Sequence, residues 1–234
     1  MQRIAIIAMT IVCSSLCINK MESSGNLNIE EHPAKVQQVQ EEQEQEAPET
    51  VETSIVPGQY PIMGSSDIAV SQMVNYFNEH CGSYPAEILG DGGAPDIESF
   101  CQIYYEEAEK EGVRAEVAFA QTMKETGWLQ YGGDAAIEQY NFAGIGTTGG
   151  GVPGNSFADV RTGVRAQIQH LKAYATEEEL EETCVDERYT YVSKGSAPYV
   201  EWLGQQENPA GCGWATGKNY GYDIVNMIQE MKGL

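Results

Sequence analysis

Positive charge is scarce in this sequence. Its 234 residues include 13 Lys and Arg against 35 Asp and Glu, which gives a formal net charge of −22 at pH 7. From residue 57 onward the chain still carries 26 acidic and 10 basic residues, so the acidity extends well beyond the N-terminal part. Nucleic acids and anionic membrane surfaces repel such a chain. We therefore expect no nucleic-acid partner, and an uncharged or weakly charged ligand fits better.

Long apolar runs are also missing. A membrane span takes about 20 apolar residues, and no apolar run in the sequence is that long. The chain begins Met-Gln-Arg and continues with an apolar run over residues 4–17, the charged start and short core of a secretory signal. Residues 1–19 are therefore predicted to be a signal peptide or N-terminal anchor, and the protein to be secreted or associated with the cell envelope. Because no clean small-x-small site follows, and neither Cys13 nor Cys17 has the small residues expected just before a lipid-modified cysteine, cleavage, anchoring and lipidation all stay open. This segment is the only membrane attachment that we expect.

Aromatic residues are absent from residues 20–56, where nine Glu stand against two Lys. A stretch of this kind cannot bury enough apolar surface to become ordered. We predict an acidic disordered tether over residues 20–64, followed by one domain over residues 65–234. No internal period suggests a repeat array, and we expect a monomer.

Signals for a metal, a cofactor or a catalytic triad are lacking too. No CxxC pair or Cys/His spacing suggests a metal site, and we expect no cofactor. The glycine run 149–151 is not followed by the Gly-Lys-Ser/Thr of phosphate-binding loops, so it does not indicate a phosphate site. It predicts a mobile loop instead. His170 has no Ser or Cys partner in a nucleophile motif, so we predict a core or surface histidine.

Four cysteines lie outside the signal segment. In an exported chain an even number permits disulfides, and four cysteines can pair in three different ways. Cys101 lies inside a helical pattern, and this position fits a buried free thiol equally well. These cysteines are Cys81, Cys101, Cys184 and Cys212.

What the sequence does contain is helical spacing of apolar residues. It predicts helices over residues 67–79, 96–111, 114–126 and 162–175, and from residue 222 toward the C-terminus. The segment 114–126 is apolar around most of its circumference, which predicts a helix buried in the middle of the domain. Strand-like alternation is limited to a short ribbon around residues 144–160. The predicted fold class is mainly α (α+β), a helical domain with a small β lobe.

Glu125 lies in the last turn of the predicted buried helix, just ahead of Gly127, a residue that commonly ends helices. The negative end of the helix dipole and burial beside Trp128 both disfavour the ionised carboxylate. Lys124 points about 100 degrees around the helix and compensates incompletely. A carboxylic acid kept protonated near neutral pH is suited to protonating a glycosidic oxygen.

The residues around Glu125 resemble those of glycoside hydrolase family 73, the cell-wall endo-β-N-acetylglucosaminidases. The resemblance lies in the stretches AFAQTMKETGW and QYNFAGIG, and a weaker match begins at Trp214 and ends at Tyr220. It implies a lysozyme-like fold with a cleft between a helical and a β lobe. It makes Glu125 the general acid and Tyr220 a residue near the scissile bond. The substrate-binding residues that we expect are Gln121, Trp128, Asn141, Phe142, Ile145 and Trp214.

The second carboxylate of many family members has no clear counterpart in this sequence. Between Asn141 and Thr176 the only acidic residue is Asp159. One account has Asp159, Asp134 or Glu138 activate water from the far face of the sugar, as in an inverting enzyme. In the other account, which we favour slightly, the 2-acetamido group of the substrate attacks the anomeric carbon, so that no second acid is required.

These observations predict an exported hydrolase of β-1,4 bonds at N-acetylglucosamine in the glycan strands of peptidoglycan. A lytic transglycosylase or a muramidase acting on the same glycan is the alternative among enzymes. A wall-binding protein that keeps the fold without catalysis is the alternative from a different class.

Overall fold

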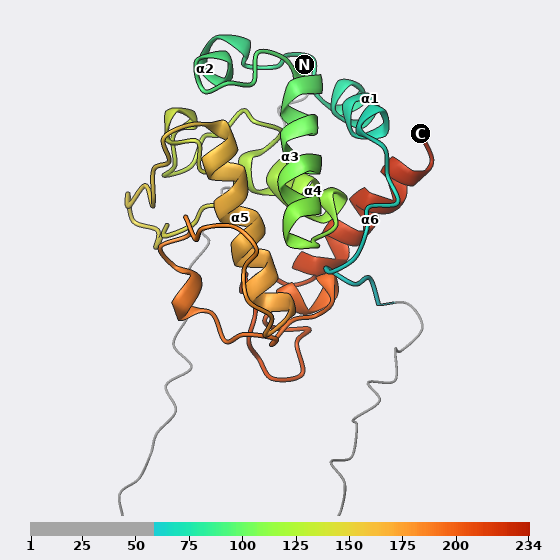
Figure 1. Cartoon of the computed structure of the whole chain (residues 1–234), viewed down its shortest axis with the longest axis vertical. Helices are drawn as coiled ribbons and strands as arrows, with labels where there is room; N and C mark the ends of the chain where they lie inside the picture. The colour runs from blue at the N-terminus through green and yellow to red at the C-terminus, as the bar shows by residue number, and fades with distance from the viewer. Residues whose placement is uncertain (1–58) are drawn as a thin grey trace, which may run out of the picture. The chain divides into compact units, whose positions relative to one another are not determined.

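The computed structural model describes residues 59–234. This part of the chain is mainly helical, with six α-helices and three short 3₁₀ helices (Figure 1). The α-helices are α1 (Val70–His80), α2 (Ala86–Asp91), α3 (Ile97–Glu111), α4 (Ala115–Thr126), α5 (Val160–Ala175) and α6 (Tyr220–Lys232). The 3₁₀ helices are η1 (Ile137–Gln139), η2 (Tyr189–Tyr191) and η3 (Val200–Leu203). Residues 59–234 contain isolated β-bridges and no β-strand.

Helix α4 occupies the centre of the helical packing. All its residues from Ala115 to Met123 are buried, and the helix contacts α3, α5 and α6 (Figure 1). A helix surrounded in this way needs apolar or internally bonded side chains on every face. The prediction that residues 114–126 form a buried helix is confirmed.

The other predicted helices are also confirmed, with ends shifted by a few residues. Helix α3 begins where the Asp96 side chain accepts a hydrogen bond of 2.7 Å from the backbone N–H of Ser99. It ends at Gly112, which has a left-handed φ of 70°. The six-residue helix α2 was not predicted, since it is too short to display a helical period.

The predicted β ribbon over residues 144–160 is wrong. The segment consists of turns, with a single bridge between Gly149 and Val152. Its glycines at positions 144, 146, 149, 150, 151 and 154 all have positive φ. Positive φ interrupts the extended backbone that a strand requires. The mobility of this loop stays a prediction.

The folded domain begins earlier than residue 65. Ile62 is fully buried; its N–H donates to the carbonyl of Pro198 (3.1 Å), and its own carbonyl accepts from the N–H of Arg114 (2.9 Å). Tyr60 is also buried. The last residues of the predicted tether therefore belong to the domain. The signal segment and the tether up to residue 58 lie outside the described residues.

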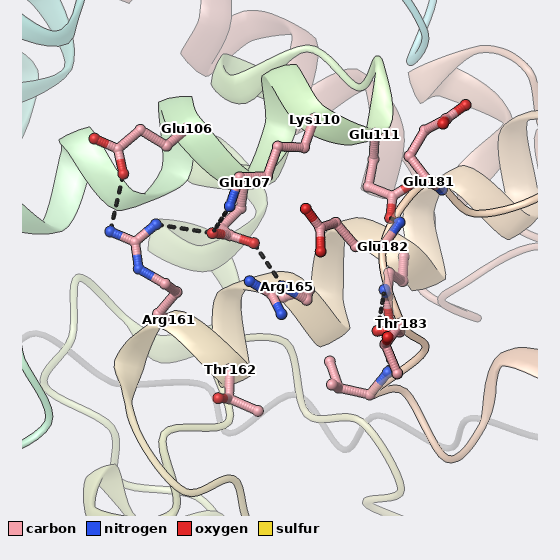
Figure 2. A network of polar contacts seen from close by, with 12 residues as sticks. Glu106, Glu107, Lys110, Glu111, Arg161, Thr162, Arg165, Glu181, Glu182 and Thr183 are labelled. Carbon is pink, nitrogen blue, oxygen red and sulfur yellow. Dashed lines mark hydrogen bonds and ion pairs between the residues drawn. The ribbon is translucent and has the colours of Figure 1, made fainter.

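Helices α3 and α5 are joined by a cluster of charges around Glu107 (Figure 2). The buried Glu107 carboxylate accepts hydrogen bonds from Arg161 (2.8 Å), Arg165 (2.7 Å) and Lys110 (2.9 Å). Burial raises the pKa of this carboxyl, but the three cationic donors outweigh burial and lower the pKa to about 2. Glu107 is therefore ionised and links the two helices at any pH in ordinary use.

Among residues 59–234, no disulfide joins any two of Cys81, Cys101, Cys184 and Cys212, so the pairings that the sequence permits among them are not formed. Cys101 is buried in the core, so of the two alternatives that the sequence left open for it the structure shows the buried thiol. Within residues 59–234, no helix combines the length and the hydropathy that a membrane crossing needs.

Candidate active site

Glu125 lies in the last turn of α4, and the helix ends immediately after it. Gly127 takes a left-handed conformation with φ of 58°, and its N–H bonds back to the carbonyl of Met123. Only a residue without a Cβ adopts this conformation without steric cost. The predicted helix stop at Gly127 is confirmed, and Glu125 is a partly exposed residue at the end of a buried helix.

Three of the four residues after Gly127 have positive φ. Trp128 and Leu129 have φ of 62° and Tyr131 has φ of 55°. Such conformations cost about 1–2 kcal/mol for each residue with a side chain. Thr126 offsets part of this cost, because its hydroxyl donates to the carbonyl of Thr122 (2.7 Å) and accepts from the N–H of Leu129 (2.9 Å). The chain thus turns sharply directly beside Glu125.

Burial dominates the electrostatics of Glu125 and raises its pKa from 4.5 to about 7. Two neighbours act in the opposite direction. The Tyr220 hydroxyl donates a hydrogen bond to Glu125 Oε1, and the ammonium of Lys124 lies nearby. The result is a carboxyl that is substantially protonated near neutral pH and can still release its proton, as a general acid requires.

Lys124 is held away from a direct bond to Glu125. Its Nζ donates to Asp223 Oδ2 on α6 at 2.7 Å and lies 5.6 Å from the centre of the Tyr220 ring. Much of its charge is therefore balanced by another carboxylate. The sequence-based expectation that Lys124 compensates incompletely agrees with this geometry.

Hydrogen bonds continue from Tyr220 into the core. Tyr220 is buried, and its hydroxyl accepts from Gln121 Nε2 at 3.0 Å. Gln121 Oε1 in turn accepts from Gln167 Nε2 of α5 at 2.9 Å. The structure thus brings Glu125, Tyr220 and Gln121 together, as the sequence resemblance suggested. Gln167 was not among the predicted residues.

Most of the predicted substrate-binding residues are buried. Exposed fractions are 0% for Gln121 and Phe142, 1% for Asn141, 4% for Ile145 and 3% for Trp214. Phe142 packs edge-on against Phe100 at 5.2 Å, and Trp214 packs edge-on against His170 at 4.8 Å. These side chains form the core beneath the site and do not present a surface to a ligand, because contact with a sugar requires exposed area.

Asn141 organises the loop that carries the motif. Its Oδ1 accepts from the N–H of Ile145 at 2.9 Å, and its Nδ2 donates to the carbonyls of Ile145 (2.9 Å) and Asn155 (3.0 Å). The amide group is thus bonded to backbone at both ends. The motif residue Asn141 fixes the turn and has no hydrogen left for a substrate.

Trp128 is the one predicted substrate-binding residue that is partly exposed. Its ring stacks on His80 with centroids 4.5 Å apart and an interplanar angle of 1°. Tyr76 flanks the same ring at 5.2 Å. This packing holds Trp128 in place three residues after Glu125, and Trp128 keeps part of its surface exposed for stacking on a sugar.

The candidates for a second acid lie in three different settings. Asp159 caps α5, because its Oδ1 accepts from the N–H of Thr162 at 2.7 Å. Asp134 and Glu138 are exposed. Burial and the negative charge of Glu138 raise the pKa of Tyr131, whose hydroxyl donates to the carbonyl of Asn141 at 3.3 Å. Among the groups that shift the pKa of Glu125 there is no carboxylate.

His170 has a structural partner in the core. His170 is buried and its Nδ1 lies 2.6 Å from Asp186 Oδ2, so of the two predicted placements, core or surface, the structure shows the core. A hollow lined by Glu109, Glu111, Lys172 and Glu182 contains no residue of the Glu125 site. In the part of the chain that is described, no group of three or more His, Cys, Asp and Glu side chains is arranged to hold a metal.

Two comparisons with known proteins show what the sequence of this chain is similar to. The family model described as mannosyl-glycoprotein endo-beta-N-acetylglucosaminidase, the glucosaminidase family, matches residues 101–233. An uncharacterized protein of Borreliella burgdorferi is 36% identical over 148 residues, which cover 63% of this chain and 69% of that protein. The family match begins within α3 and includes Glu125, Gln121, Gln167 and Tyr220. The resemblance seen in the sequence motifs is confirmed, and the chain belongs to the glucosaminidase family, glycoside hydrolase family 73.

Proposed function

We propose that this protein is an exported endo-β-N-acetylglucosaminidase that hydrolyses β-1,4 bonds in the glycan strands of peptidoglycan and leaves N-acetylglucosamine at the new reducing end. The observation that carries this proposal is the state of Glu125, whose pKa burial raises to about 7. The family to which the chain belongs supports a glycoside hydrolase acting on a cell-wall glycan. The export part depends on the N-terminal sequence alone.

In the proposed reaction Glu125 donates its proton to the glycosidic oxygen as the bond to the anomeric carbon breaks. The leaving sugar departs as a neutral alcohol, which avoids a poor alkoxide leaving group. The Glu125 carboxylate that remains keeps its hydrogen bond from Tyr220, which stabilises the new charge. Trp128, partly exposed beside Glu125, is the proposed sugar-stacking residue.

For the attack on the anomeric carbon we propose substrate assistance. As the glycosidic bond breaks and Glu125 protonates the leaving oxygen, the carbonyl oxygen of the 2-acetamido group bonds to the anomeric carbon and forms a cyclic oxazolinium intermediate. Water then opens this ring, and Glu125 takes up a proton from that water. The capping bond of Asp159 supports this account, because that carboxylate already has a structural function. Water activation by Asp159, Asp134 or Glu138 is the alternative, and it inverts the anomeric configuration.

The lysozyme-like arrangement, with the glycan lying in a cleft over Glu125, is part of the same proposal. A monomer is sufficient for it, because Glu125, Tyr220 and Trp128 all come from one chain. A lytic transglycosylase is the second candidate. What favours it is that the described site holds one clear acid and no carboxylate partner acting on it, since that chemistry uses an internal hydroxyl in place of water.

The test is to digest purified peptidoglycan with the full-length protein, reduce the products with borohydride and identify the new ends by mass spectrometry. The proposal predicts N-acetylglucosaminitol ends. Anhydromuramic ends would support the transglycosylase, and muramitol ends a muramidase; either result would overturn the proposed bond specificity. Binding to the wall with no new ends of any kind would identify a non-catalytic wall-binding protein.

A further inference from the structure

A continuous line of buried polar side chains leads from α5 to the carboxyl of Glu125. Gln167 donates to Gln121 (2.9 Å), Gln121 donates to Tyr220 (3.0 Å), and Tyr220 donates to Glu125. Exposed fractions are 0% for both glutamines and 2% for Tyr220. Because water has no access to the interior links, the polar atoms in this line depend on protein partners for their hydrogen bonds.

The direction of the line is set at Gln167. Its Nε2 lies 3.0 Å from the carbonyl oxygen of Ala118, which can only accept a hydrogen bond. Its Oε1 receives the hydroxyls of Tyr104 (2.9 Å) and Thr122 (2.9 Å). Rotating the amide by half a turn would place two oxygens against each other at Ala118. The amide of Gln167 therefore has one stable orientation, with its second N–H directed at Gln121.

This orientation determines the next two links in turn. Since Gln121 Oε1 must accept from Gln167, Gln121 Nε2 faces Tyr220 and donates to its hydroxyl oxygen. The hydroxyl of Tyr220 is then an acceptor on one side, and its single proton is directed at Glu125.

We propose that Gln167 is a positioning residue for the catalytic acid, holding the Tyr220 proton toward Glu125 through the amide of Gln121. This inference rests on the proposed function of Glu125 as the general acid. A hydrogen bond to the charged form of a carboxyl favours that form. With the line intact, Glu125 is therefore a stronger acid than its burial alone would make it. Without Gln167, the Gln121 amide is free to turn its oxygen toward Tyr220 and draw the proton away from Glu125.

The charged and titratable groups around Glu125 allow this effect to be isolated. They are Tyr220 of α6 and Lys124 of α4, and Lys124 is itself paired with Asp223 of α6. Helix α5 contributes no charge to this set. A neutral substitution at position 167 therefore changes the hydrogen bonding of Glu125 without changing the charges around it.

The test compares Gln167→Met with Gln169→Met in the full-length protein. Methionine matches glutamine in length and lacks the amide. Gln169 is also fully buried on α5, but it bonds to the backbone of Thr183 (3.1 Å) and Val185 (2.8 Å), away from the line. In Gln167→Met we expect the alkaline limb of the kcat/KM profile on peptidoglycan to move up by about one pH unit. In Gln169→Met the limb stays in place while the melting temperature falls. An unmoved limb in Gln167→Met, or an equal shift in both variants, would overturn the inference.

Two further measurements keep the inference independent of folding losses and of the activity itself. Tyr220→Phe should move the limb upward on its own, and the double variant Tyr220→Phe/Gln167→Met should move it no further. Additive shifts would contradict action through Tyr220. If Gln167→Met does not fold, Gln167→Leu removes the same amide and should give the same shift. Carboxyl ¹³C NMR reads the titration of Glu125 directly, because the Glu125 signal is the one that is lost in Glu125→Gln. This measurement does not depend on activity. A protein that hydrolyses no peptidoglycan would therefore refute the proposed function and would still test the role of Gln167.

Discussion

At the scale of single residues, the properties of Glu125 result from opposing effects of unequal size. Burial raises its pKa, whereas the Tyr220 hydrogen bond and the Lys124 charge lower it, and the net value is about 7. A fully exposed glutamate would be ionised at neutral pH, and a buried glutamate without Tyr220 would hold its proton too tightly. The intermediate value is what proton donation and return both require.

The raised pKa of Glu125 also has a consequence for stability. A carboxyl whose pKa is higher in the folded than in the unfolded state stabilises the protein below the unfolded value of 4.5, and this contribution is lost as the pH rises through about 7. At pH 8, Glu125→Gln should be more stable than the parent by on the order of 3 kcal/mol, and at pH 4 the two should be nearly equal. Urea unfolding at the two pH values measures this difference.

The control for this experiment is Glu138→Gln. Glu138 is exposed, so its replacement should leave the free energy of unfolding within about 0.5 kcal/mol of the parent at both pH values. Equal stability of Glu125→Gln and the parent at pH 8 would argue that the folded protein does not disfavour the Glu125 carboxylate.

At the scale of elements, the two loops that carry the motif residues are held in shape by different interactions. The turn after α4 is held in a left-handed conformation by Gly127 and by the Thr126 hydroxyl, and the loop after Asn141 is tied by that side chain to Ile145 and Asn155. Motif residues that look like ligand contacts in the sequence are thus partly the internal bonds of these loops. A sequence pattern alone does not separate the two roles, because both require a specific side chain at a specific position.

Helix α5 offers a test of whether Asp159 is a cap or a catalytic group. Asn caps a helix as well as Asp, whereas Ala loses about 1 kcal/mol. We expect Asp159→Asn to keep both the stability and the wall hydrolysis of the parent, and Asp159→Ala to lower only the stability. Thermal unfolding and turnover of peptidoglycan would be measured for both. A folded Asp159→Asn protein that has lost about a hundredfold in turnover would instead make Asp159 the second catalytic carboxylate.

At the scale of the whole domain, the long helices were predictable and the contacts between them were not. Helices α3, α4 and α5 follow from apolar spacing and from the caps Asp96 and Gly112, which act over a few residues. The ribbon at residues 144–160 was wrong because glycines with positive φ are not distinguishable in sequence from glycines in strands. Gln167 did leave a signal, a polar residue on the apolar face with Val164 and Leu171, but its partners come from α3 and α4 and only the structure reveals them.

Glu107 joins α3 to α5 and makes the domain's stability depend on acid. A carboxyl with a lowered pKa stabilises the folded state above its unfolded value of 4.5, and that stability is lost as the pH falls toward about 2. We expect Glu107→Gln to lower the free energy of unfolding by on the order of 2–3 kcal/mol at pH 6, and the difference from the parent to shrink steadily between pH 4.5 and pH 2.

The matched control is Glu106→Gln, one residue earlier on the same helix. Its side chain is 41% exposed and pairs with Arg161 at the surface, so its loss should cost under about 1 kcal/mol. Guanidinium unfolding at several pH values compares the two variants. Equal costs, or a Glu107→Gln difference that does not change with pH, would contradict the role assigned to Glu107.

The central claim, that Glu125 is the acid of a wall-glycan hydrolase, is tested most directly by the turnover of purified peptidoglycan by Glu125→Gln beside the parent at pH 6. Glutamine keeps the shape of the side chain and can still accept from Tyr220, but it has no proton to donate. The account predicts a folded variant that releases new N-acetylglucosamine reducing ends about a hundred to ten thousand times more slowly than the parent. Release within about twofold of the parent rate would show that another group protonates the bond.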